Sequence, residues 1–175
     1  PAIISVCIDI TAQKKAQAEV VHLYNNVPGA VFRVRYDADF SVADANDGLY
    51  ELLGYTREEF TALGNRMTAV VYPDDLNAVR DKLLAEENRN NTIQDEHRLV
   101  CKNGNVKWIS LKTQVMPGDD GTPYFYGFLV DITDEKLAQE RVRELYEKEL
   151  AYFAQAASLE GSIQGRVNVT QDRVE

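Results

Sequence analysis

The sequence predicts an α+β domain in which an antiparallel sheet carries short helices on one face and long helices at both ends. Three observations predict this fold. Segments that alternate between apolar and polar residues are separated by short turns rich in Gly, Asp and Asn. A group of short helical patterns lies between the first two of these segments and the last three. Long segments with a helical apolar seam precede and follow them.

The N-terminal part of the chain is predicted to form a strand and then a helix. Residues 2–10, AIISVCIDI, are rich in β-branched residues. The hydroxyl of Thr11 is a suitable acceptor for a free backbone N–H at the start of the next helix. Pro28-Gly29 should end that helix near Val27.

The middle of the chain predicts two strands, several short helices and three further strands. Gly54 should end the first short helix, and Thr56 with Glu59 forms a capping box for the second. Pro73 should open a longer helix, whose N-terminus Asp74 and Asp75 would complement electrostatically. The five strands are expected over residues 32–36, 40–45, 93–101, 106–116 and 124–132.

The C-terminal part predicts one charged helix. Thr133 should cap it by accepting an N–H two or three residues further on, and the helix should reach about Ser158. Its apolar residues follow a 4-3 seam that Glu149 interrupts. The seam consists of Ala138, Val142, Leu145, Tyr152, Ala156 and Leu159.

The composition excludes several classes of partner. The 175 residues carry a net charge of −9, so the surface should repel phosphates, and neither nucleic acid nor an anionic membrane is expected to bind. No apolar run reaches the roughly 18–20 residues of a membrane span, and no signal peptide opens the chain. Cys7 and Cys101 fit two free thiols in the cytoplasm, although a disulfide between them stays open.

One stretch of sequence occurs twice. Residues 8–20, IDITAQKKAQAEV, match residues 130–142, VDITDEKLAQERV, at seven of 13 positions and at an offset of 122. The hypotheses are a tandem repeat of one domain or a coincidence between two capped helix starts, and the separation of about one domain favours the repeat.

Four ordered motifs carry a resemblance to a known family. They are NDGLYELLGYTREEF, YPDD, EHRLVCKNGNVKWI and GFLVDIT, which together span about residues 28–133. They resemble the PAS sensor family, specifically the members with a PAC segment. The resemblance implies the sheet order 2-1-5-4-3. It also implies that the triplet Asp131-Ile132-Thr133 ends the last strand and starts the following helix. From this position we predict that the triplet relays a signal from the strand to the helix; the alternative is that it only joins the two elements.

The resemblance divides the chain into five parts. Residues 1–11 would be the last strand of a preceding PAS domain, 12–27 a linker helix, 28–133 the PAS domain and 134–158 a C-terminal signalling helix. Residues 159–175 would be a linker or the start of a further sensory module.

Candidate cofactor and catalytic sites are few. His97 and Cys101 share a strand face but lie about 13 Å apart at ~3.3 Å per residue, too far to bind one metal. His97 resembles the axial haem ligand of some PAS domains, yet it occupies an aromatic position of the family pattern, which favours a core or pocket histidine. Flavin photochemistry needs an Asn-Cys-Arg-Phe stretch, and the corresponding region, LGNRMTAVVYPDD, has no cysteine. No nucleophile elbow, P-loop or dinucleotide motif predicts an enzyme.

The remaining candidate is a pocket between the sheet and the short helices, suited to a small and mostly apolar molecule. The alternative is a fully packed core that binds nothing. The predicted lining is Phe32, Val34, Tyr36, Leu53, Tyr55, Phe60, Met67, His97, Leu99, Ile109, Leu111, Thr113, Val115 and Leu129.

The functional prediction is a cytoplasmic sensory and dimerisation module of a larger signalling protein, with a histidine kinase or a diguanylate cyclase as its output domain. The competing hypothesis is a ligand-free spacer for protein interactions. A homodimer is expected because the helical seams and the outer sheet face leave apolar surface uncovered. The predicted dimer face comprises Leu23, Trp108, Phe128, Val130, Val142 and Leu145.

Overall fold

The computed structural model describes residues 19, 22, 24–85 and 91–171, and the side chains of the last helix up to residue 156. The predicted strand over residues 2–10, the helix start at Thr11, and Cys7 and Leu23 lie outside the described residues. The chain divides into two compact units, Pro1–Thr133 and Asp134–Glu175.

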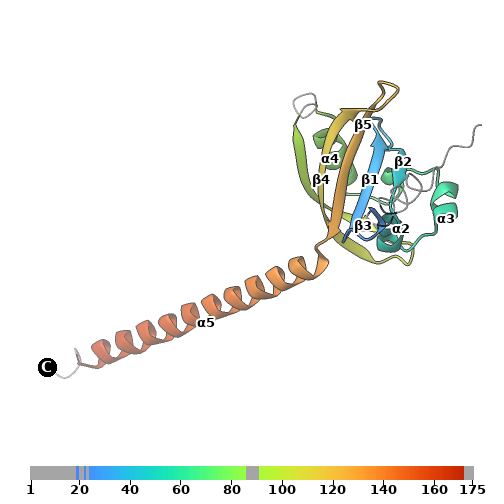
Figure 1. Ribbon diagram of the computed structural model, residues 1–175. Helices are drawn as coiled ribbons and strands as arrows, with labels where there is room; N and C mark the ends of the chain where they lie inside the picture. The colour runs from blue at the N-terminus through green and yellow to red at the C-terminus, as the bar shows by residue number, and fades with distance from the viewer. Residues whose placement is uncertain (1–18, 20–21, 23, 86–90, 172–175) are drawn as a thin grey trace, which may run out of the picture. The chain divides into compact units, whose positions relative to one another are not determined.

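The first unit contains one five-stranded antiparallel sheet (Figure 1). Its strand order, β2-β1-β5-β4-β3, confirms the predicted order 2-1-5-4-3. The strands are β1 Ala30–Arg35, β2 Val42–Ala45, β3 Thr92–Val100, β4 Val106–Pro117 and β5 Pro123–Asp131. Residue 40 was predicted to lie in the second strand, but Phe40 ends a turn with a left-handed backbone (φ 49°).

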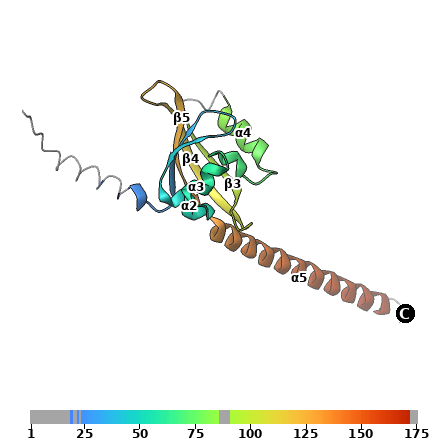
Figure 2. The same ribbon diagram turned by 90° about the vertical axis from the view of Figure 1, so that its right-hand side faces the viewer.

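Short helices cover one face of this sheet (Figures 1 and 2). Their bounds are α2 Asp47–Leu53, α3 Arg57–Ala62, the 3-10 turn η1 Met67–Ala69 and α4 Leu76–Leu84. Gly54 ends α2 in the left-handed conformation that glycine adopts without strain. The predicted capping box at Thr56 and Glu59 is present with both of its hydrogen bonds. These local signals explain why the chain turns sharply here.

The start of α4 differs from the prediction. Asp75 is the N-cap residue, yet its carboxylate makes no cap hydrogen bond. It instead binds the Arg98 guanidinium at 2.5 and 2.9 Å and accepts the Arg98 backbone N–H at 2.9 Å. Two charge-assisted bonds outweigh one cap, and they hold the pKa of Asp75 below its usual value. Asp75 therefore ties α4 to β3.

The second unit is dominated by one helix, α5, Thr133–Gln171. It does not end near residue 158 as predicted but continues for another 13 residues. After Ser158 the sequence contains no proline. Gly161 and Gly165 each cost a helix about 1 kcal/mol, which is too little to end it. Among the described residues, no helix has both the length and the apolar character that a membrane span requires.

Candidate functional site

A cavity of about 40 Å³ lies between the inner face of the sheet and α4. Seven residues of the predicted pocket line it, namely Phe32, Val34, Met67, His97, Leu111, Thr113 and Leu129. Five further lining residues were not predicted: Phe40, Val71, Val79, Leu83 and Phe125. The lining is almost wholly apolar, so the cavity would select against charged molecules.

Seven predicted pocket residues lie elsewhere. Leu53, Phe60, Leu99 and Ile109 are buried in the core, while Tyr36 and Tyr55 are half-buried against it, as is Val115. Close ring packing fills the core at α2 and α3, because Phe60 makes edge contacts with Tyr50 at 5.9 Å and Tyr55 at 6.0 Å. The inner face of the sheet therefore borders open space only along part of its length.

The size of the cavity limits what it holds. A space of about 40 Å³ accommodates a few water molecules or a diatomic gas. Pockets for drug-sized ligands are typically about 300–1,000 Å³. Haem or flavin would require the core to open. Within the described ranges, no three His, Cys, Asp or Glu side chains gather in a way that could hold a metal ion.

His97 is the main polar group at the cavity, and a chain of polar contacts holds it. Its Nδ1 lies 2.9 Å from Asp95 Oδ2, and Asp95 Oδ1 lies 2.7 Å from Lys82 Nζ. Burial acts to raise the pKa of Asp95, but the bonds from His97 and Lys82 outweigh burial and lower it. The ionised carboxylate therefore fixes the orientation of the imidazole ring. Thr113, on the neighbouring strand, donates its hydroxyl to Tyr126 O at 3.1 Å.

The Asp131-Ile132-Thr133 junction is fastened to Trp108 in β4. The N–H of Ile132 donates to Trp108 O at 2.9 Å, and the N–H of Trp108 donates to Thr133 Oγ1 at 3.0 Å. The Thr133 hydroxyl in turn donates to Asp131 Oδ1 at 2.5 Å. The Thr133 hydroxyl was predicted to accept an N–H two or three residues further on. It instead bridges two strands.

Asp131 supplies the acceptor at the start of α5. Its Oδ1 accepts the N–H of Thr133 at 3.0 Å, two residues further on, and its Oδ2 lies 3.0 Å from Lys107 Nζ. Burial acts to raise the pKa of Asp131, but the bonds from Thr133 and Lys107 outweigh it, so this pKa is lowered. One carboxylate thus organises both the backbone turn and a neighbouring cation.

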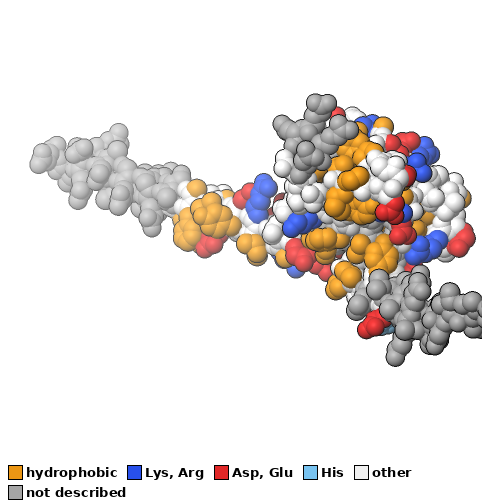
Figure 3. Space-filling view, turned by 45° about the horizontal axis from the view of Figure 1, so that its top comes forward, with side chains coloured by type: hydrophobic (Ala, Val, Ile, Leu, Met, Phe, Trp, Pro, Cys, Tyr) orange, Lys and Arg blue, Asp and Glu red, His pale blue; other side chains and the backbone are white. Residues whose placement is uncertain are grey.

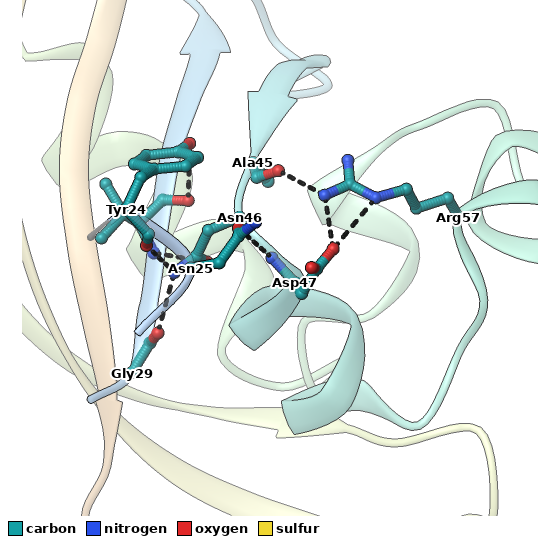
Figure 4. A network of polar contacts seen from close by, with 8 residues as sticks. Tyr24, Asn25, Gly29, Ala45, Asn46, Asp47 and Arg57 are labelled. Carbon is teal, nitrogen blue, oxygen red and sulfur yellow. Dashed lines mark hydrogen bonds and ion pairs between the residues drawn. The ribbon is translucent and has the colours of Figure 1, made fainter. Parts of the chain in front are cut away.

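A second polar network, centred on Asn46, was missed by the sequence reasoning (Figure 4). Asn46 is fully buried (0% exposed), and its side chain bonds to backbone groups of Tyr24, Gly29 and Val31, before and within β1. Beside it, Arg57 donates to Ala45 O at 3.1 Å and to Asp47 Oδ1 at 2.7 Å. In the sequence Asn46 looked like an ordinary helix start. The only available signal was an amide side chain directly before the apolar pattern of α2.

The predicted dimer face is partly exposed. On the outer side of the sheet Phe128 is 44% and Val130 37% exposed, and Trp108 is half-buried. In α5, Val142 is 67% and Leu145 61% exposed. Figure 3 shows apolar side chains gathered on the sheet unit and, separately, along the described part of α5.

Comparisons with known proteins agree on the family. The family model described as "PAS fold" matches residues 42–129. The chain is 30% identical over 157 residues to the methyl sulfide methyltransferase-associated sensor of Methanosarcina acetivorans, which covers 88% of this chain and 15% of that protein. It is 33% identical over 107 residues to the probable diguanylate cyclase DgcE of Escherichia coli, covering 59% of this chain and 9% of that protein.

A solved structure gives the same fold. The PAS domain of an HTR-like protein from Haloarcula marismortui superimposes with a TM-score of 0.58 at 17% identity, covering 69% of this chain and 95% of that one. The chain spans less than a sixth of either curated relative, so it corresponds to a small part of each. The sheet order, the helices on its inner face and the matching family model together identify the chain as a member of the PAS family.

Proposed function

We propose that this chain is a sensory and dimerisation module of a larger cytoplasmic signalling protein, without catalytic activity of its own. Two relatives support a signalling role, because one is named as a sensor and the other as a probable diguanylate cyclase. The output domain would be a diguanylate cyclase or a histidine kinase in the parent protein.

The observation that carries this proposal is the position of Leu129. It lines the cavity on the inner face of β5, and it lies two residues before Asp131. A change in the cavity that moves Leu129 along the strand would therefore act on the Asp131–Thr133 hydrogen bond. It would also act on the two hydrogen bonds that tie the junction to Trp108. Losing a bond of this capping type costs about 0.5–2 kcal/mol. That range overlaps the roughly 1–3 kcal/mol of a typical allosteric coupling.

The ligand, on this proposal, is small and mostly apolar. His97 and Thr113 are the polar lining residues, and both already bond to protein groups. The second candidate function is a ligand-free spacer, and the cavity of about 40 Å³ favours it. The two functions differ in one respect, which is whether occupation of the cavity changes the output.

Filling the cavity with protein atoms separates the two functions. Leu83→Phe adds bulk from α4 into the cavity, and Leu84→Phe adds the same bulk at the neighbouring, half-buried position that does not line it. For a ligand sensor, Leu83→Phe in the full-length parent locks the regulated output in one state, while Leu84→Phe leaves regulation intact. Normal regulation in both variants would support the spacer. Val79→Leu, a smaller addition to the same cavity, serves if Leu83→Phe folds poorly.

The partner for dimerisation is a second copy of this chain. The apolar outer sheet face and the exposed seam of α5 support this part of the proposal. We expect light scattering at micromolar concentration to give the mass of a dimer. A monomeric mass there would overturn the dimerisation part and leave the sensory part standing.

A further inference from the structure

The segment that enters the domain is held by an unusual set of contacts. The side chain of Asn46 accepts the N–H of Val31 at 2.9 Å and donates to Tyr24 O at 3.0 Å and to Gly29 O at 3.3 Å. The backbone N–H of Asn46 also donates to Val31 O at 3.0 Å. One buried amide therefore binds backbone groups on both sides of the Pro28-Gly29 turn. We call this set of contacts the Asn46 latch.

Two glycines allow the latched segment to lie close against the sheet. Gly29 has φ +108°, and a Cβ there would lie 2.7 Å from Leu129 O. A Cβ at Gly48, in α2, would lie 2.3 Å from Gly29 O. Because both distances are shorter than real Cβ contacts, the backbone at Gly29 is confined between α2 and β5. A displacement of the entering segment must therefore move one of these two elements.

The entering segment contacts β5, the strand that leads out of the domain. Ala30 pairs with Leu129 in the register of β1 and β5, and Leu129 lies two residues before Asp131. The entering segment and the leaving junction are thus neighbours in the sheet. This path runs along the backbone and does not cross the cavity.

We propose that the Asn46 latch is an input joint. It passes a displacement of the preceding helix through Gly29 and Leu129 to the Asp131-Ile132-Thr133 junction, with no ligand in the cavity. The domain then relays a signal from an upstream module of the same protein, whichever way the cavity test resolves. Such a relay needs no ligand, so a domain with so small a cavity would still transmit a signal.

The repeated sequence extends into the segment that the latch binds. The match at an offset of 122 continues past residue 20, because Leu23 and Tyr24 correspond to Leu145 and Tyr146. Tyr24 is held by the latch through its carbonyl group, and its hydroxyl donates to Val31 O at 3.3 Å. The repeat unit thus extends as far as a residue that the latch binds.

The test compares two Asn→Asp substitutions in this chain by hydrogen exchange. Asn46→Asp keeps the shape and one acceptor but removes both N–H donors to Tyr24 and Gly29. Asn103→Asp is the matched control, because Asn103 lies in an exposed turn and uses only its acceptor, towards the N–H of Asn105. For an input joint, Asn46→Asp raises exchange about tenfold both in residues 25–31 and in residues 130–134. Exchange in β3 stays unchanged, and the control variant behaves as wild type.

Two outcomes would overturn the proposal. Faster exchange confined to residues 25–31 would make the latch a local fastening with no link to the junction. An equal rise throughout the sheet would reduce Asn46 to a contributor to global stability. If Asn46→Asp fails to fold, Asn25→Ala serves in its place, because Asn25 Oδ1 accepts the N–H of Asp47 at 3.3 Å at the edge of the same network. The same three exchange patterns then decide.

Discussion

The two copies of the repeated linker begin alike and end differently. Both carry the Asp-Ile-Thr triplet, an apolar seam and the Leu-Tyr pair, but Pro28-Gly29 in the first copy corresponds to Leu150-Ala151 in the second. The first copy is helical at Asn25 and turns at Asn26. The second continues as α5 to Gln171. We therefore expect Pro28 and Gly29 to be what turns the first copy, because the second copy has residues compatible with a helix at these positions.

The copies also differ at the position of Val27, where the second copy has Glu149. In the second copy this position belongs to the helical seam that includes Val142 and Leu145. A charged residue there weakens helix pairing and restricts register. If α5 pairs with a second copy of the chain as proposed, Glu149 would limit that pairing, whereas the first copy leads into the sheet.

The largest effect is expected when the glycine on which the turn of the first copy depends is replaced. Gly29→Ala should lower the free energy of unfolding of the sheet unit by about 3 kcal/mol, through left-handed strain and the clash with Leu129 O. Gly104→Ala is the control, because Gly104 has φ +84° with open space around it, and it should cost about 1 kcal/mol. Urea unfolding measures both. Equal losses would show that the approach to β5 is not tight.

A second pair of substitutions places the Pro-Gly of the first copy at the corresponding positions of the second copy. Leu150→Pro with Ala151→Gly should interrupt α5 at a local cost of about 3 kcal/mol. We expect lower helix content by circular dichroism and weaker dimerisation, with the unfolding midpoint of the sheet unit unchanged. Leu150→Ala with Ala151→Ser, which remain compatible with a helix, is the control. Undiminished helix content in the proline variant would contradict the assignment of these two residues as the switch.

The junction at Asp131 gives a smaller effect that depends on pH. The lowered pKa of Asp131 means that its ionised form stabilises the fold above the unfolded value of about 3.9, and that this stabilisation is lost as pH falls through the folded pKa. Asp131→Asn keeps an acceptor for Thr133 but loses the ion pair with Lys107, at a cost of about 1 kcal/mol near neutral pH. The gap between variant and wild type in urea unfolding should be full near neutral pH and should close as pH falls through the lowered folded pKa of Asp131. Asp134→Asn, three residues on, is the control. A gap that is constant with pH would contradict this account.

The smallest effect is expected from a substitution in the helical seam of α5, where the two copies differ at Glu149. Glu149→Val installs the residue of the first copy, and it should tighten dimerisation about tenfold, equivalent to about 1.4 kcal/mol. Glu147→Val, on an exposed position that pairs with Arg143 outside the seam, should not tighten it. Sedimentation equilibrium measures both dissociation constants. An unchanged constant for Glu149→Val would show that this helix face is not where the copies meet.

The sequence predicted the fold well because each fold signal is local. The capping box at Thr56, the glycine end at Gly54 and the alternating strands depend on neighbouring residues, and the family motifs supplied the strand order. The end of α5 was predicted too early, because the helix continues to Gln171 through two glycines that cost it too little to end it.

The cavity could be predicted only in part, because its shape depends on packing between distant elements. Alternation correctly placed Phe32 and Leu129 on the inner face, but it does not tell which part of that face the aromatic rings fill. Phe40 reaches the cavity from a left-handed turn, which no periodicity indicates. Asn46 escaped prediction for the same reason, since its partners lie 15 to 22 residues away.

The hydrogen bonds between Trp108 and the Asp131-Ile132-Thr133 junction have an experimental consequence, because Trp108 is the single tryptophan of the chain. Its backbone holds Ile132 and Thr133, and its ring lies 5.5 Å from the Arg98 guanidinium, which also stacks on Tyr72 at 4.0 Å and binds Asp75. The indole therefore sits where the start of α4, strand β3 and the start of α5 are joined. Excited at 295 nm, about where tyrosine no longer absorbs, the native protein emits from this one place. Its fluorescence therefore reports, without an added label, on the Asp131-Ile132-Thr133 junction, which on the proposed function leads to the output domain.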